Sequence, residues 1–412
     1  MKFGLLGHPL GHSFSPILHS YFGDYEYTLF DLPETNLQDF FKTKDFKGIN
    51  VTIPYKEKVI DYLDEKDASV DEIGSCNTII NNNGSLIGYN TDFFGLKLLI
   101  EDSGLSMEGK TVAILGTGGT SKTAKAVCAS LGVKKTYIVS RNKKPGCISY
   151  DELYLIASDI EVILNATPVG MSPNFDAKPV DLIRFRNLLG VIDVIYNPIR
   201  SSLIQEATSL GLIGVSGLKM LAGQAFKASM LFQDKELDPS LLQTAYRALL
   251  SQKQNIVLIG MPSSGKSKLG GVLARKLNRE YIDTDELFVK RVKMSIADYM
   301  SMFGEKNFRR VEKEIIQSLN NVTSAVISTG GGVVLDPENV TNLRYNGKIF
   351  FLDRPLDQLK PSSSRPLSNN ETALKKMYET RYPIYLKAMD VRIEGGLGVE
   401  YEVNKVCEEL GL

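Results

Sequence analysis

Cysteine is scarce in this 412-residue chain, and tryptophan is absent. The four cysteines lie far apart, form no Cys-x-x-Cys pair and have no histidine close by, which excludes a zinc-binding motif and a disulfide framework. We therefore expect free thiols in a reducing compartment. The cysteines are Cys76, Cys128, Cys147 and Cys407.

Histidine is also rare, and all three histidines fall within residues 1–19. Such a cluster suggests a metal site, but Pro9 and Gly11 interrupt the spacing, so one helical face cannot present the three rings together. We expect no metal there. The histidines are His8, His12 and His19.

No charge of one sign dominates, because Lys+Arg and Asp+Glu both number 48. This balance argues against nucleic acid or an anionic membrane surface as a partner, and it leaves small charged ligands held by local sites. No apolar run approaches the ~18 residues of a membrane span, and the start of the chain is too short in apolar residues for a signal peptide. We expect a cytoplasmic protein, and the sequence does not predict an oligomer.

The remaining composition is that of a globular protein, with 43% hydrophobic and 23% charged residues. At about 100 to 200 residues per domain, the length predicts two or three domains. Short β-rich runs alternate with helical patterns along the whole chain, which is typical of parallel α/β layers. These runs include KFGLLG, TVAILG, TYIVS, VILNA, VIDVIY, NIVLIG, AVISTG and KIFFLD.

Two of the expected strands run directly into a glycine-rich turn and then a helix, at residues 111–132 and 255–277. Two such nucleotide-binding units are hard to fit into one sheet, so we expect separate domains. Apolar residues near helical spacing predict a closing helix between them. The expected limits are 1–100 for an amino-terminal substrate lobe, 101–232 for a Rossmann lobe, 233–253 for the closing helix and linker, and 254–412 for a P-loop domain.

The first turn, GTGGTS, follows an apolar strand and precedes an Ala-rich helix, which predicts a pyrophosphate site. A turn that only lets the helix pack on the strand is the alternative. Where an NAD-binding fold places an acidic residue, the next strand ends without one, which favours the 2′-phosphate of NADP(H) over a merely solvated basic loop. The residues there are Ser140, Arg141, Asn142 and Lys143.

Several loop motifs follow one another over residues 1 to about 250: LGHSFSP, NVTIPYK, CNTI, GYNTD, GTGGT, NATPVGM, DVIYNP and GLKMLAGQAF. Their order resembles the shikimate dehydrogenase family, which implies NADPH-dependent reduction of 3-dehydroshikimate to shikimate. Reducing a ketone requires a hydride and a proton, and a lysine beside an aspartate is a suitable donor pair. The resemblance assigns Lys56 as the acid/base and Asp92 as the residue that holds it and the substrate hydroxyls. Outside the family, Lys56 would be a solvated lysine and Asp92 part of a helix cap.

The same resemblance implies the other contacts of this site. Ser13 and Ser15 would bind the substrate carboxylate through their hydroxyls. Further substrate contacts would be Thr52, Asn77, Tyr196 and Gln224; the nicotinamide end would be held at Val194, Gly217 and Met220; and the pyrophosphate turn would comprise Gly116, Thr117, Gly118, Gly119 and Thr120.

The second turn, GMPSSGKS, satisfies G-x-x-x-x-G-K-[ST] and follows the apolar strand that this motif requires. Backbone N–H groups would wrap the phosphates of ATP, Lys266 would reach the β and γ phosphates, and Ser267 would hold Mg²⁺. A chance match in an unrelated loop is the alternative. The loop residues expected at the nucleotide are Gly260, Ser263, Ser264, Gly265, Lys266 and Ser267.

Downstream of this P-loop, the motifs YIDTDEL, GEKNFRRVE, STGGGVV, SSSRPL and ETRYPIY resemble the shikimate kinase family over about residues 254–412. That resemblance implies that Asp283 helps to organise the metal and that Asp285 takes the substrate hydroxyls as the base. It further assigns the carboxylate to Arg309 and Arg381, which suits the planar guanidinium. Gly331 would offer a backbone contact, and Arg365 would act from a mobile lid on the transferring phosphoryl group.

Two features depart from these families. The lid, DQLKPSSSRPLSNNET, is short, and Lys360 stands where many shikimate kinases carry an arginine under the nucleotide base. In the first half, the 2′-phosphate prediction depends mainly on Arg141.

The sequence as a whole predicts a bifunctional enzyme that reduces 3-dehydroshikimate and then phosphorylates shikimate at its 3-hydroxyl. One rival interpretation is oxidation of quinate or related cyclitols by the first half, against which the Ser13 and Ser15 pair argues. Another is that one half is a catalytically silent nucleotide sensor. The presence of Lys56, Asp92, Lys266 and Asp285 argues against that possibility.

Overall fold

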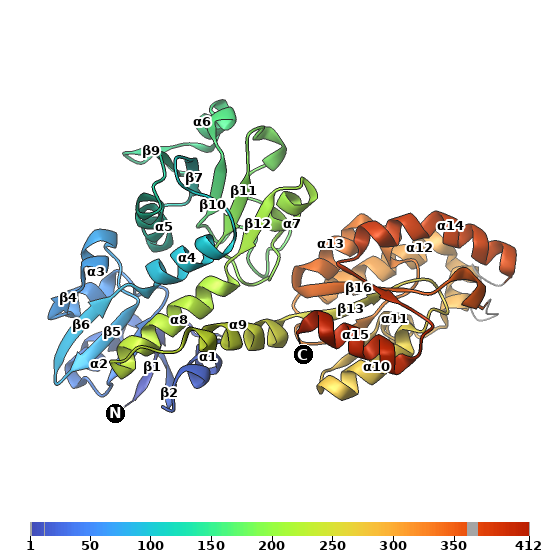
Figure 1. Cartoon of the computed structure of the whole chain (residues 1–412), viewed down its shortest axis with the longest axis horizontal. Helices are drawn as coiled ribbons and strands as arrows, with labels where there is room; N and C mark the ends of the chain where they lie inside the picture. The colour runs from blue at the N-terminus through green and yellow to red at the C-terminus, as the bar shows by residue number, and fades with distance from the viewer. Residues whose placement is uncertain (1, 12, 361–369, 412) are drawn as a thin grey trace. The chain divides into compact units, whose positions relative to one another are not determined.

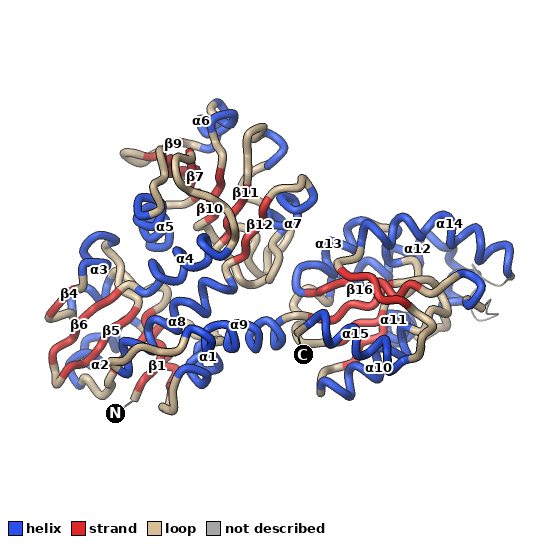
Figure 2. The backbone as a smooth tube through the Cα atoms, in the orientation of Figure 1, coloured by secondary structure: helices blue, strands red, loops and turns tan. Residues whose placement is uncertain are grey.

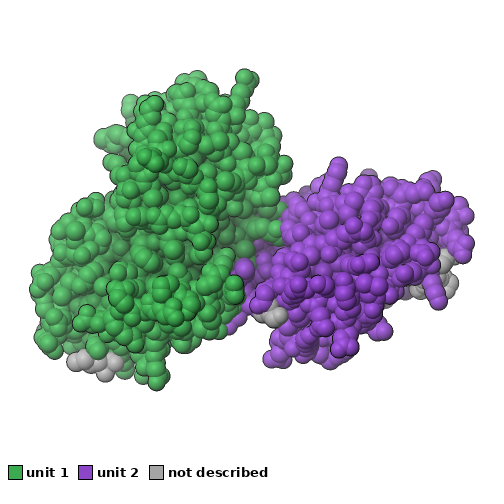
Figure 3. Space-filling view, in the orientation of Figure 1, with its two compact units in different colours: residues 1–249 green, residues 250–412 purple. Residues whose placement is uncertain are grey.

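The computed structural model describes residues 2–11, 13–360 and 370–411 and divides into two compact units, Met1–Leu249 and Leu250–Leu412 (Figure 3). The first unit contains two six-stranded sheets and the second contains one five-stranded sheet. Helices flank the strands in both units (Figures 1 and 2). The expected α/β class with parallel sheets is thereby confirmed.

The first sheet of unit 1 has the order β2-β1-β3-β5-β6-β4, in which β5 runs antiparallel to β3 and β6 and the other pairs are parallel. Its apolar core combines residues of β1 and β3, such as Leu6 and Ile49, with Tyr55 and Val59 from the segment that follows β3. The strands are β1 (Phe3–Gly7), β2 (Tyr27–Asp31), β3 (Gly48–Val51), β4 (Glu65–Lys66), β5 (Thr78–Asn82) and β6 (Ser85–Tyr89), and the helices are α1 (Ser15–Phe22), α2 (Leu37–Thr43), α3 (Ala68–Ile73) and α4 (Thr91–Asp102).

The second sheet of unit 1 is parallel throughout, with the order β12-β11-β10-β7-β8-β9. The chain starts in the middle and reverses direction between β7 and β10, which is where doubly wound folds bind a dinucleotide. The elements are β7 (Thr111–Leu115), β8 (Lys135–Val139), β9 (Cys147–Ile148), β10 (Val162–Asn165), β11 (Gly190–Asp193), β12 (Ile213–Ser216), α5 (Gly119–Ser130), α6 (Tyr150–Leu155) and α7 (Ser202–Ser209).

Helix α8 (Leu218–Gln233) connects the two sheets of unit 1, because it packs along α4 and also contacts α1 (Figure 1). The close approach of α4 and α8 requires glycine: a Cβ at Gly223 would lie 3.1 Å from the Cα of Gly95. Helix α9 (Pro239–Lys253) follows and spans the division between the units. The closing helix expected at 233–253 is therefore observed, beginning a few residues later.

The sheet of unit 2 is parallel, with the order β14-β15-β13-β16-β17. Its central strand β13 is almost fully buried and leads straight into the P-loop. The elements are β13 (Asn255–Ile259), β14 (Tyr281–Asp283), β15 (Val326–Ser328), β16 (Gly347–Asp353), β17 (Val391–Glu394), α10 (Lys266–Leu277), α11 (Thr284–Val292), α12 (Ile296–Ser318), α13 (Pro337–Asn346), α14 (Glu371–Ala388) and α15 (Val399–Leu410).

Short 3₁₀ segments connect several of these elements, at Glu34–Asn36, Lys58–Tyr62, Ala157–Asp159, Leu182–Arg184, Val333–Leu335 and Leu356–Gln358. Among the described residues, no helix combines the length and the apolar character that a membrane span requires.

Candidate active sites

Lys56 and Asp92 form an ion pair in unit 1, with Nζ and Oδ2 2.6 Å apart. Lys56 follows β3 in a loop, and Asp92 lies in the first turn of α4, whose amino end is capped by Asn90. The lysine side chain is 24% exposed and the aspartate side chain 10%, so a ligand can reach the ammonium group. The structure thus brings together the two residues that the sequence singles out as a proton donor pair.

The other expected substrate contacts of unit 1 come from the loops around this pair. The Ser13 hydroxyl accepts the backbone N–H of Ser15 at 3.2 Å, and Ser15 is buried at the start of α1. The amide of Asn77 bonds to Thr91 at both ends: its Nδ2 donates to the Thr91 hydroxyl at 3.1 Å and its Oδ1 accepts the Thr91 N–H at 2.7 Å. Asn77 is therefore fixed beside Asp92, while Thr52 follows β3 directly.

Tyr196 and Gln224 come from the second sheet and from α8. Burial raises the pKa of the Tyr196 phenol. The Lys56 ammonium partly opposes this rise, so Tyr196 lies within the electrostatic influence of Lys56. Gln224 donates to the Leu221 carbonyl at 3.0 Å within α8. The expected substrate residues therefore come from both parts of unit 1.

The glycine-rich turn of unit 1 follows β7 at the point where the sheet order reverses. Gly116 has a φ of 108°, a conformation that side chains disfavour, and its carbonyl accepts the Ser121 hydroxyl at 2.7 Å. Gly118 is the residue before α5, and no atom lies within 4 Å of where its Cβ would be. The turn, which includes Thr117, Gly119 and Thr120, therefore leaves open space at a helix amino end, as a pyrophosphate requires.

The loop after β8 carries the residues expected at a 2′-phosphate. Ser140 is buried and accepts the Asn142 N–H at 3.3 Å, whereas Arg141 is exposed. Lys144, which sequence reasoning did not select, donates to the Thr117 hydroxyl at 2.9 Å and so links this loop to the glycine turn. The signal that could have found it is the run of basic residues that continues past Arg141.

The residues expected at the nicotinamide end lie close together. A Cβ at Gly217 would overlap the Val194 carbonyl, so only glycine permits this approach, and Met220 is buried one turn further along α8. The residue before Val194, Asp193, was not selected from the sequence. It is fully buried and accepts hydrogen bonds from Ser201 Oγ at 2.5 Å, the Ile195 N–H at 3.1 Å and Asn165 Nδ2 at 3.0 Å.

Burial raises the pKa of Asp193 to about 6, although all three hydrogen bonds oppose the rise. These bonds tie the ends of β10 and β11 to the start of α7. The carboxyl therefore supports the segment that carries Val194 and Tyr196. An aspartate at a strand end is easily overlooked in the sequence, because its role depends on the side chain turning inward.

In unit 2, the P-loop spans Gly260–Ser267 between β13 and α10. Gly260 and Gly265 have φ values of 151° and 104°, and Ser263 also has positive φ, which shapes the loop into a nest of N–H groups. The Lys266 ammonium donates to the carbonyls of Gly260 and Met261, both at 2.9 Å, and is mostly buried. It sits at the place where phosphate oxygens would replace those carbonyls.

A metal site is outlined by two oxygen ligands beside the P-loop. The Ser267 hydroxyl donates to the Asp283 carboxylate at 2.9 Å, and the other oxygen of Asp283 accepts the Asp285 N–H at 2.9 Å. Hydroxyl and carboxylate oxygens are ligands that Mg²⁺ prefers. No group of three or more metal-binding side chains occurs among the described residues, so a cation here would need phosphate oxygens as well.

The expected carboxylate-binding arginines already have partners. Arg309 pairs with Glu312 at 2.7 Å and with Glu305 at 3.1 Å, and Arg381 donates to the Gly331 carbonyl at 2.9 Å. Burial raises the pKa of Glu312, an effect that Arg309 opposes and Asp285 reinforces. Glu305 and Glu312 therefore compensate the positive charge of Arg309 in this structure.

The glycine triplet 330–332 lets these groups approach the backbone. A Cβ at Gly330 would lie 2.8 Å from Oδ1 of Asp285, and one at Gly332 would overlap the Arg309 guanidinium. A Cβ at Gly331 would lie 2.8 Å from the ring of Pro262 in the P-loop. The triplet is therefore more than a turn, because each glycine makes room for a different part of the site.

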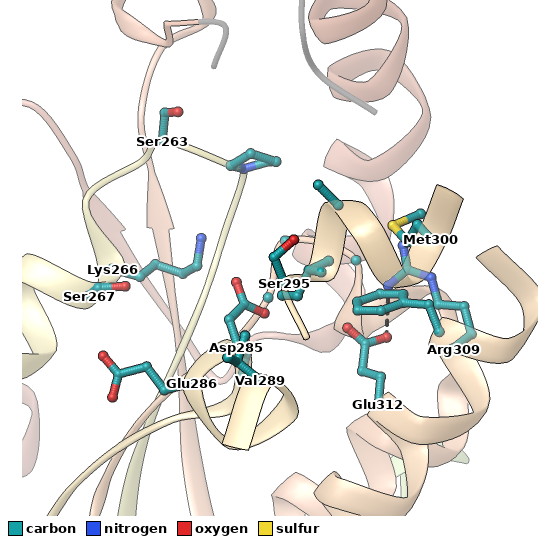
Figure 4. Close-up of a pocket in the computed structure, with 18 of the residues that line it drawn as sticks. Ser263, Lys266, Ser267, Asp285, Glu286, Val289, Ser295, Met300, Arg309 and Glu312 are labelled. Atoms are coloured by element: carbon teal, nitrogen blue, oxygen red, sulfur yellow. Dashed lines mark hydrogen bonds and ion pairs between the residues drawn. The ribbon is translucent and has the colours of Figure 1, made fainter. Parts of the chain in front are cut away.

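These groups line a cavity of about 1050 Å³ in unit 2 (Figure 4). The close-up shows Asp285 in the middle of the cavity, with Lys266 and Ser263 on one side and Arg309, Glu312 and Met300 on the other. Apolar side chains supply part of the wall, including Val289, Met300 and Phe308. The groups expected to bind phosphate and carboxylate thus face one space, with a candidate base between them.

Two expectations for unit 2 concern the lid. Arg365 lies outside the described residues, so its expected role stays a prediction. Lys360, the fourth residue of the lid, is described and is exposed.

Comparison with known proteins agrees with this arrangement. The chain is 35% identical over 259 residues to the NADP-dependent shikimate dehydrogenase of Clostridium beijerinckii, a match that covers 59% of this chain and 96% of the relative. The chain belongs to the shikimate dehydrogenase family. The family model for the shikimate dehydrogenase substrate-binding domain matches residues 5–79, and the model for shikimate kinase matches residues 262–410. A shikimate dehydrogenase is thus fused to a shikimate kinase domain.

Solved shikimate dehydrogenases have the fold of unit 1. Shikimate dehydrogenase 1 of Peptoclostridium difficile is 38% identical, with a TM-score of 0.56, and the match covers 60% of this chain and 98% of that one. The enzyme of Thermus thermophilus, solved with NADP(H) and shikimate, is 27% identical with a TM-score of 0.55, covering 60% and 99% of the two chains. The shikimate dehydrogenase similarity therefore extends over the whole of unit 1 and over nearly the whole of these neighbours.

Proposed function

We propose that this chain catalyses two consecutive reactions on one ring acid. Unit 1 reduces 3-dehydroshikimate to shikimate with NADPH, and unit 2 phosphorylates the 3-hydroxyl of shikimate with ATP and Mg²⁺. The observation that carries the proposal is that each unit pairs a phosphate-binding glycine turn with acid/base groups, Lys56 with Asp92 in one and Asp285 in the other. We keep the domain limits 1–100, 101–232, 233–253 and 254–412 as part of it.

In unit 1, the Lys56–Asp92 pair supports proton transfer to the carbonyl oxygen of the substrate. Lys56 Nζ donates the proton to the carbonyl oxygen; NADPH, when bound, would supply the hydride to the carbonyl carbon, leaving the alcohol and NADP⁺. Asp92 holds the lysine in place through the 2.6 Å contact. The hydroxyls of Ser13 and Ser15 bind the carboxylate of the ring, and Tyr196 closes the site from the second sheet.

The cofactor assignment for unit 1 agrees with the residues present. The open turn at Gly118 fits a pyrophosphate, and the basic loop with Arg141 and Lys144 fits a 2′-phosphate, since neither an aspartate nor a glutamate follows β8. The Thermus thermophilus neighbour was solved with NADP(H) and shikimate, which supports the same pair of ligands here.

In unit 2, Asp285 takes the proton of the 3-hydroxyl while the hydroxyl oxygen bonds to the γ-phosphorus and ADP leaves. Lys266 stabilises the charge on the transferring group, and Ser267 and Asp283 hold Mg²⁺. The ring carboxylate binds Arg309 and Arg381, with the Gly331 backbone beside it. We further propose that Arg365 neutralises charge on the phosphoryl group.

The setting of these reactions also belongs to the proposal. Small ring acids and nucleotides are the partners that the sites favour, without nucleic acid or a membrane, and we place the chain in the cytoplasm. No oligomer is needed for either site, because every proposed group comes from one chain.

Two assays on the purified full chain test this function. With shikimate and NADP⁺, absorbance at 340 nm should rise, and with shikimate, ATP and Mg²⁺, ADP should form. Quinate in place of shikimate should support neither reaction at a comparable rate. Failure of either assay with shikimate refutes that half of the proposal, and faster reduction of NADP⁺ with quinate would favour the rival cyclitol dehydrogenase.

A further inference from the structure

A histidine buried beside the substrate site of unit 1 has no part in the chemistry described so far. His19 lies one turn after Ser15 on α1, and only 1% of its surface is exposed. Its ring stacks on Tyr27 at 4.1 Å between centroids and 15° between planes, and on Phe232 of α8 at 5.5 Å. Burial lowers the pKa of His19 to about 3, so the ring is neutral.

The proton on this ring can be placed from its hydrogen-bond chain. Gln233 Nε2 donates to the Phe22 carbonyl at 3.0 Å and to Ser229 Oγ at 2.9 Å, which fixes the amide orientation. The Ser229 hydroxyl is then available to donate to Tyr25 at 2.7 Å, and Tyr25 to Nδ1 of His19 at 2.6 Å. Nδ1 is therefore the acceptor, and the proton of the neutral imidazole is on Nε2.

Nε2 finds no hydrogen-bond partner of acceptable geometry among the described residues, although the Asn50 side chain lies beside the ring. A buried N–H without an acceptor is unfavourable. Phenylalanine would stack on Tyr27 equally well and would leave no polar atom unpaired. Apolar packing alone therefore does not explain a histidine at this position.

Hydrogen bonds connect the neighbours of His19 with the residues expected to contact the substrate. The Tyr27 hydroxyl donates to Asn50 Oδ1 at 2.8 Å. Burial raises the pKa of this phenol, and a hydrogen bond with the Ser15 side chain partly opposes the rise. Asn50 Nδ2 in turn donates to the Thr78 hydroxyl at 3.0 Å. Asn50 lies two residues before Thr52, and Thr78 directly follows Asn77. The stacked pair of His19 and Tyr27 is thus linked to Ser15, whose hydroxyl is proposed to bind the ring carboxylate.

The same chain extends to α8. Tyr25 and Ser229 connect the imidazole to the carboxyl-terminal part of the helix that carries Gln224 and Met220. The contact is covered by an apolar cluster of Phe3, Ala228 and Phe232. His19 therefore joins α1 to α8 through the hydrogen bonds of Tyr25 and joins α1 to β2 through the ring stack on Tyr27.

We propose that His19 is a positioning residue of the substrate site: through its hydrogen bond with Tyr25, which also bonds to Ser229 of α8, it holds α1 and the Ser15 hydroxyl in the arrangement that binds the ring carboxylate. The inference rests on the proposed dehydrogenase function. It assigns no proton transfer to the histidine, whose role ends at the placement of its neighbours.

The test uses His19→Phe in the full chain, because this change keeps the stacked ring and removes both nitrogens. We expect the KM for the ketone substrate to rise about tenfold, because loss of the Tyr25 bond lets α1 shift and weakens the hydrogen bond from Ser15 to the carboxylate, with kcat within twofold and the KM for NADPH unchanged. His19→Asn, whose amide oxygen can accept the Tyr25 hydroxyl, should recover part of the lost affinity. Phosphorylation by unit 2 serves as an internal control for folding.

A matched control separates positioning from stability. Asn81→Ala removes amide bonds to the carbonyls of Lys44 and Phe46 in the same sheet, away from the network, and should lower the melting temperature without changing the KM for the ring acid. If His19→Phe does not fold, Tyr25→Phe breaks the chain at its next member and should raise the same KM severalfold.

An unchanged KM for the ketone substrate in His19→Phe, or in Tyr25→Phe should that be the variant that folds, overturns the inference. So does an increase in KM that Asn81→Ala reproduces at equal loss of stability. Absence of NADPH oxidation in the wild-type chain would instead refute the proposed function itself, so the two failures are distinguishable.

Discussion

The two candidate sites differ in how their charged groups are paired. In unit 1, the acid/base lysine already contacts its aspartate at 2.6 Å, and the expected carboxylate ligands are neutral hydroxyls. In unit 2, the cations expected to bind ligands have partners within the protein that a ligand can replace: Lys266 bonds to carbonyls of its own loop, and Arg309 pairs with Glu305 and Glu312.

This difference predicts how each site would bind an anion. On the proposed assignments, the first site would need no exchange of partners, because its carboxylate ligands are hydroxyls and Lys56 is already paired with Asp92. The second would have to release bonds that it makes to itself, so that phosphate and carboxylate groups could replace the partners of Lys266 and Arg309. Ligand binding should therefore rearrange unit 2 more than unit 1.

The largest effect is expected from removing the lysine of unit 1. Lys56→Ala should lower kcat for the dehydrogenase reaction by about 10³-fold, since general acid catalysis and charge stabilisation are lost together. Phosphorylation of shikimate should stay within twofold of wild type in the same preparation. Steady-state assays of both reactions check this, and loss of both activities would contradict independent sites.

The matching change in unit 2 is Lys266→Ala. It removes the cation that faces the transferring phosphoryl group, and we expect kcat for ADP formation to fall by about 10²- to 10³-fold. NADPH oxidation by the dehydrogenase site should be unchanged. Lys276→Ala is a suitable control, because this exposed lysine lies near the other end of the same helix and does not line the cavity. Equal losses in the two variants would contradict the assignment of Lys266.

Arginine geometry is the next point of difference. Arg381→Lys keeps the charge but loses the planar fork, so the KM for shikimate in the kinase reaction should rise by about 30-fold while the KM for ATP changes little. Arg310→Lys is the matched control, since Arg310 is exposed and pairs only with Glu314 in the described structure. The KM for shikimate in the dehydrogenase reaction should be unaffected by either change.

The buried carboxyl of Asp193 should make the stability of unit 1 depend on pH. Asp193 accepts only neutral donors, and its pKa of about 6 exceeds the ordinary 3.8, so the folded state binds more protons than the unfolded state between these values. Stability should therefore fall by about 2 kcal/mol as pH rises from about 4.5 to 7, a loss that Asp193→Asn should lack. Hydrogen exchange of amides near residues 190–204, corrected for intrinsic rates, measures it. An equal fall in both proteins would contradict the shift.

The smallest expected effect concerns cofactor choice in unit 1. Arg141→Gln should raise the KM for NADPH about tenfold and leave the KM for NADH unchanged, because only NADPH carries the 2′-phosphate. Lys144→Gln should raise the KM for NADPH about threefold, since it loses one charge at the edge of the same loop. Parallel changes for NADPH and NADH would point to the pyrophosphate turn instead.

Much of both sites could be predicted from the sequence, because their parts lie at strand ends. The P-loop and the GTGGTS turn each follow an apolar strand, and parallel strands bring their carboxyl ends to one edge. The pairing of Lys56 with Asp92 was expected as well. These predictions needed only the local order of strand, turn and helix together with the family resemblance.

The remaining contacts could not be predicted, because they depend on distances between segments remote in sequence. Lys144 reaches Thr117 through a flexible side chain, which no spacing rule describes. The contact of Tyr25 with Ser229 joins residues 204 positions apart. The inward turn of Asp193 and the compensation of Arg309 by Glu305 likewise follow from packing rather than from a motif.

The glycine triplet of unit 2 has a consequence for how this domain tolerates change. The space that a Cβ would need at each of these glycines is already filled by an atom of another residue. Even a single methyl group would therefore displace Asp285 at position 330, Pro262 at 331 or Arg309 at 332. In a saturation library, kinase-dead variants should therefore concentrate at three positions that contact no ligand through a side chain, and alanine there should be as harmful as bulkier replacements.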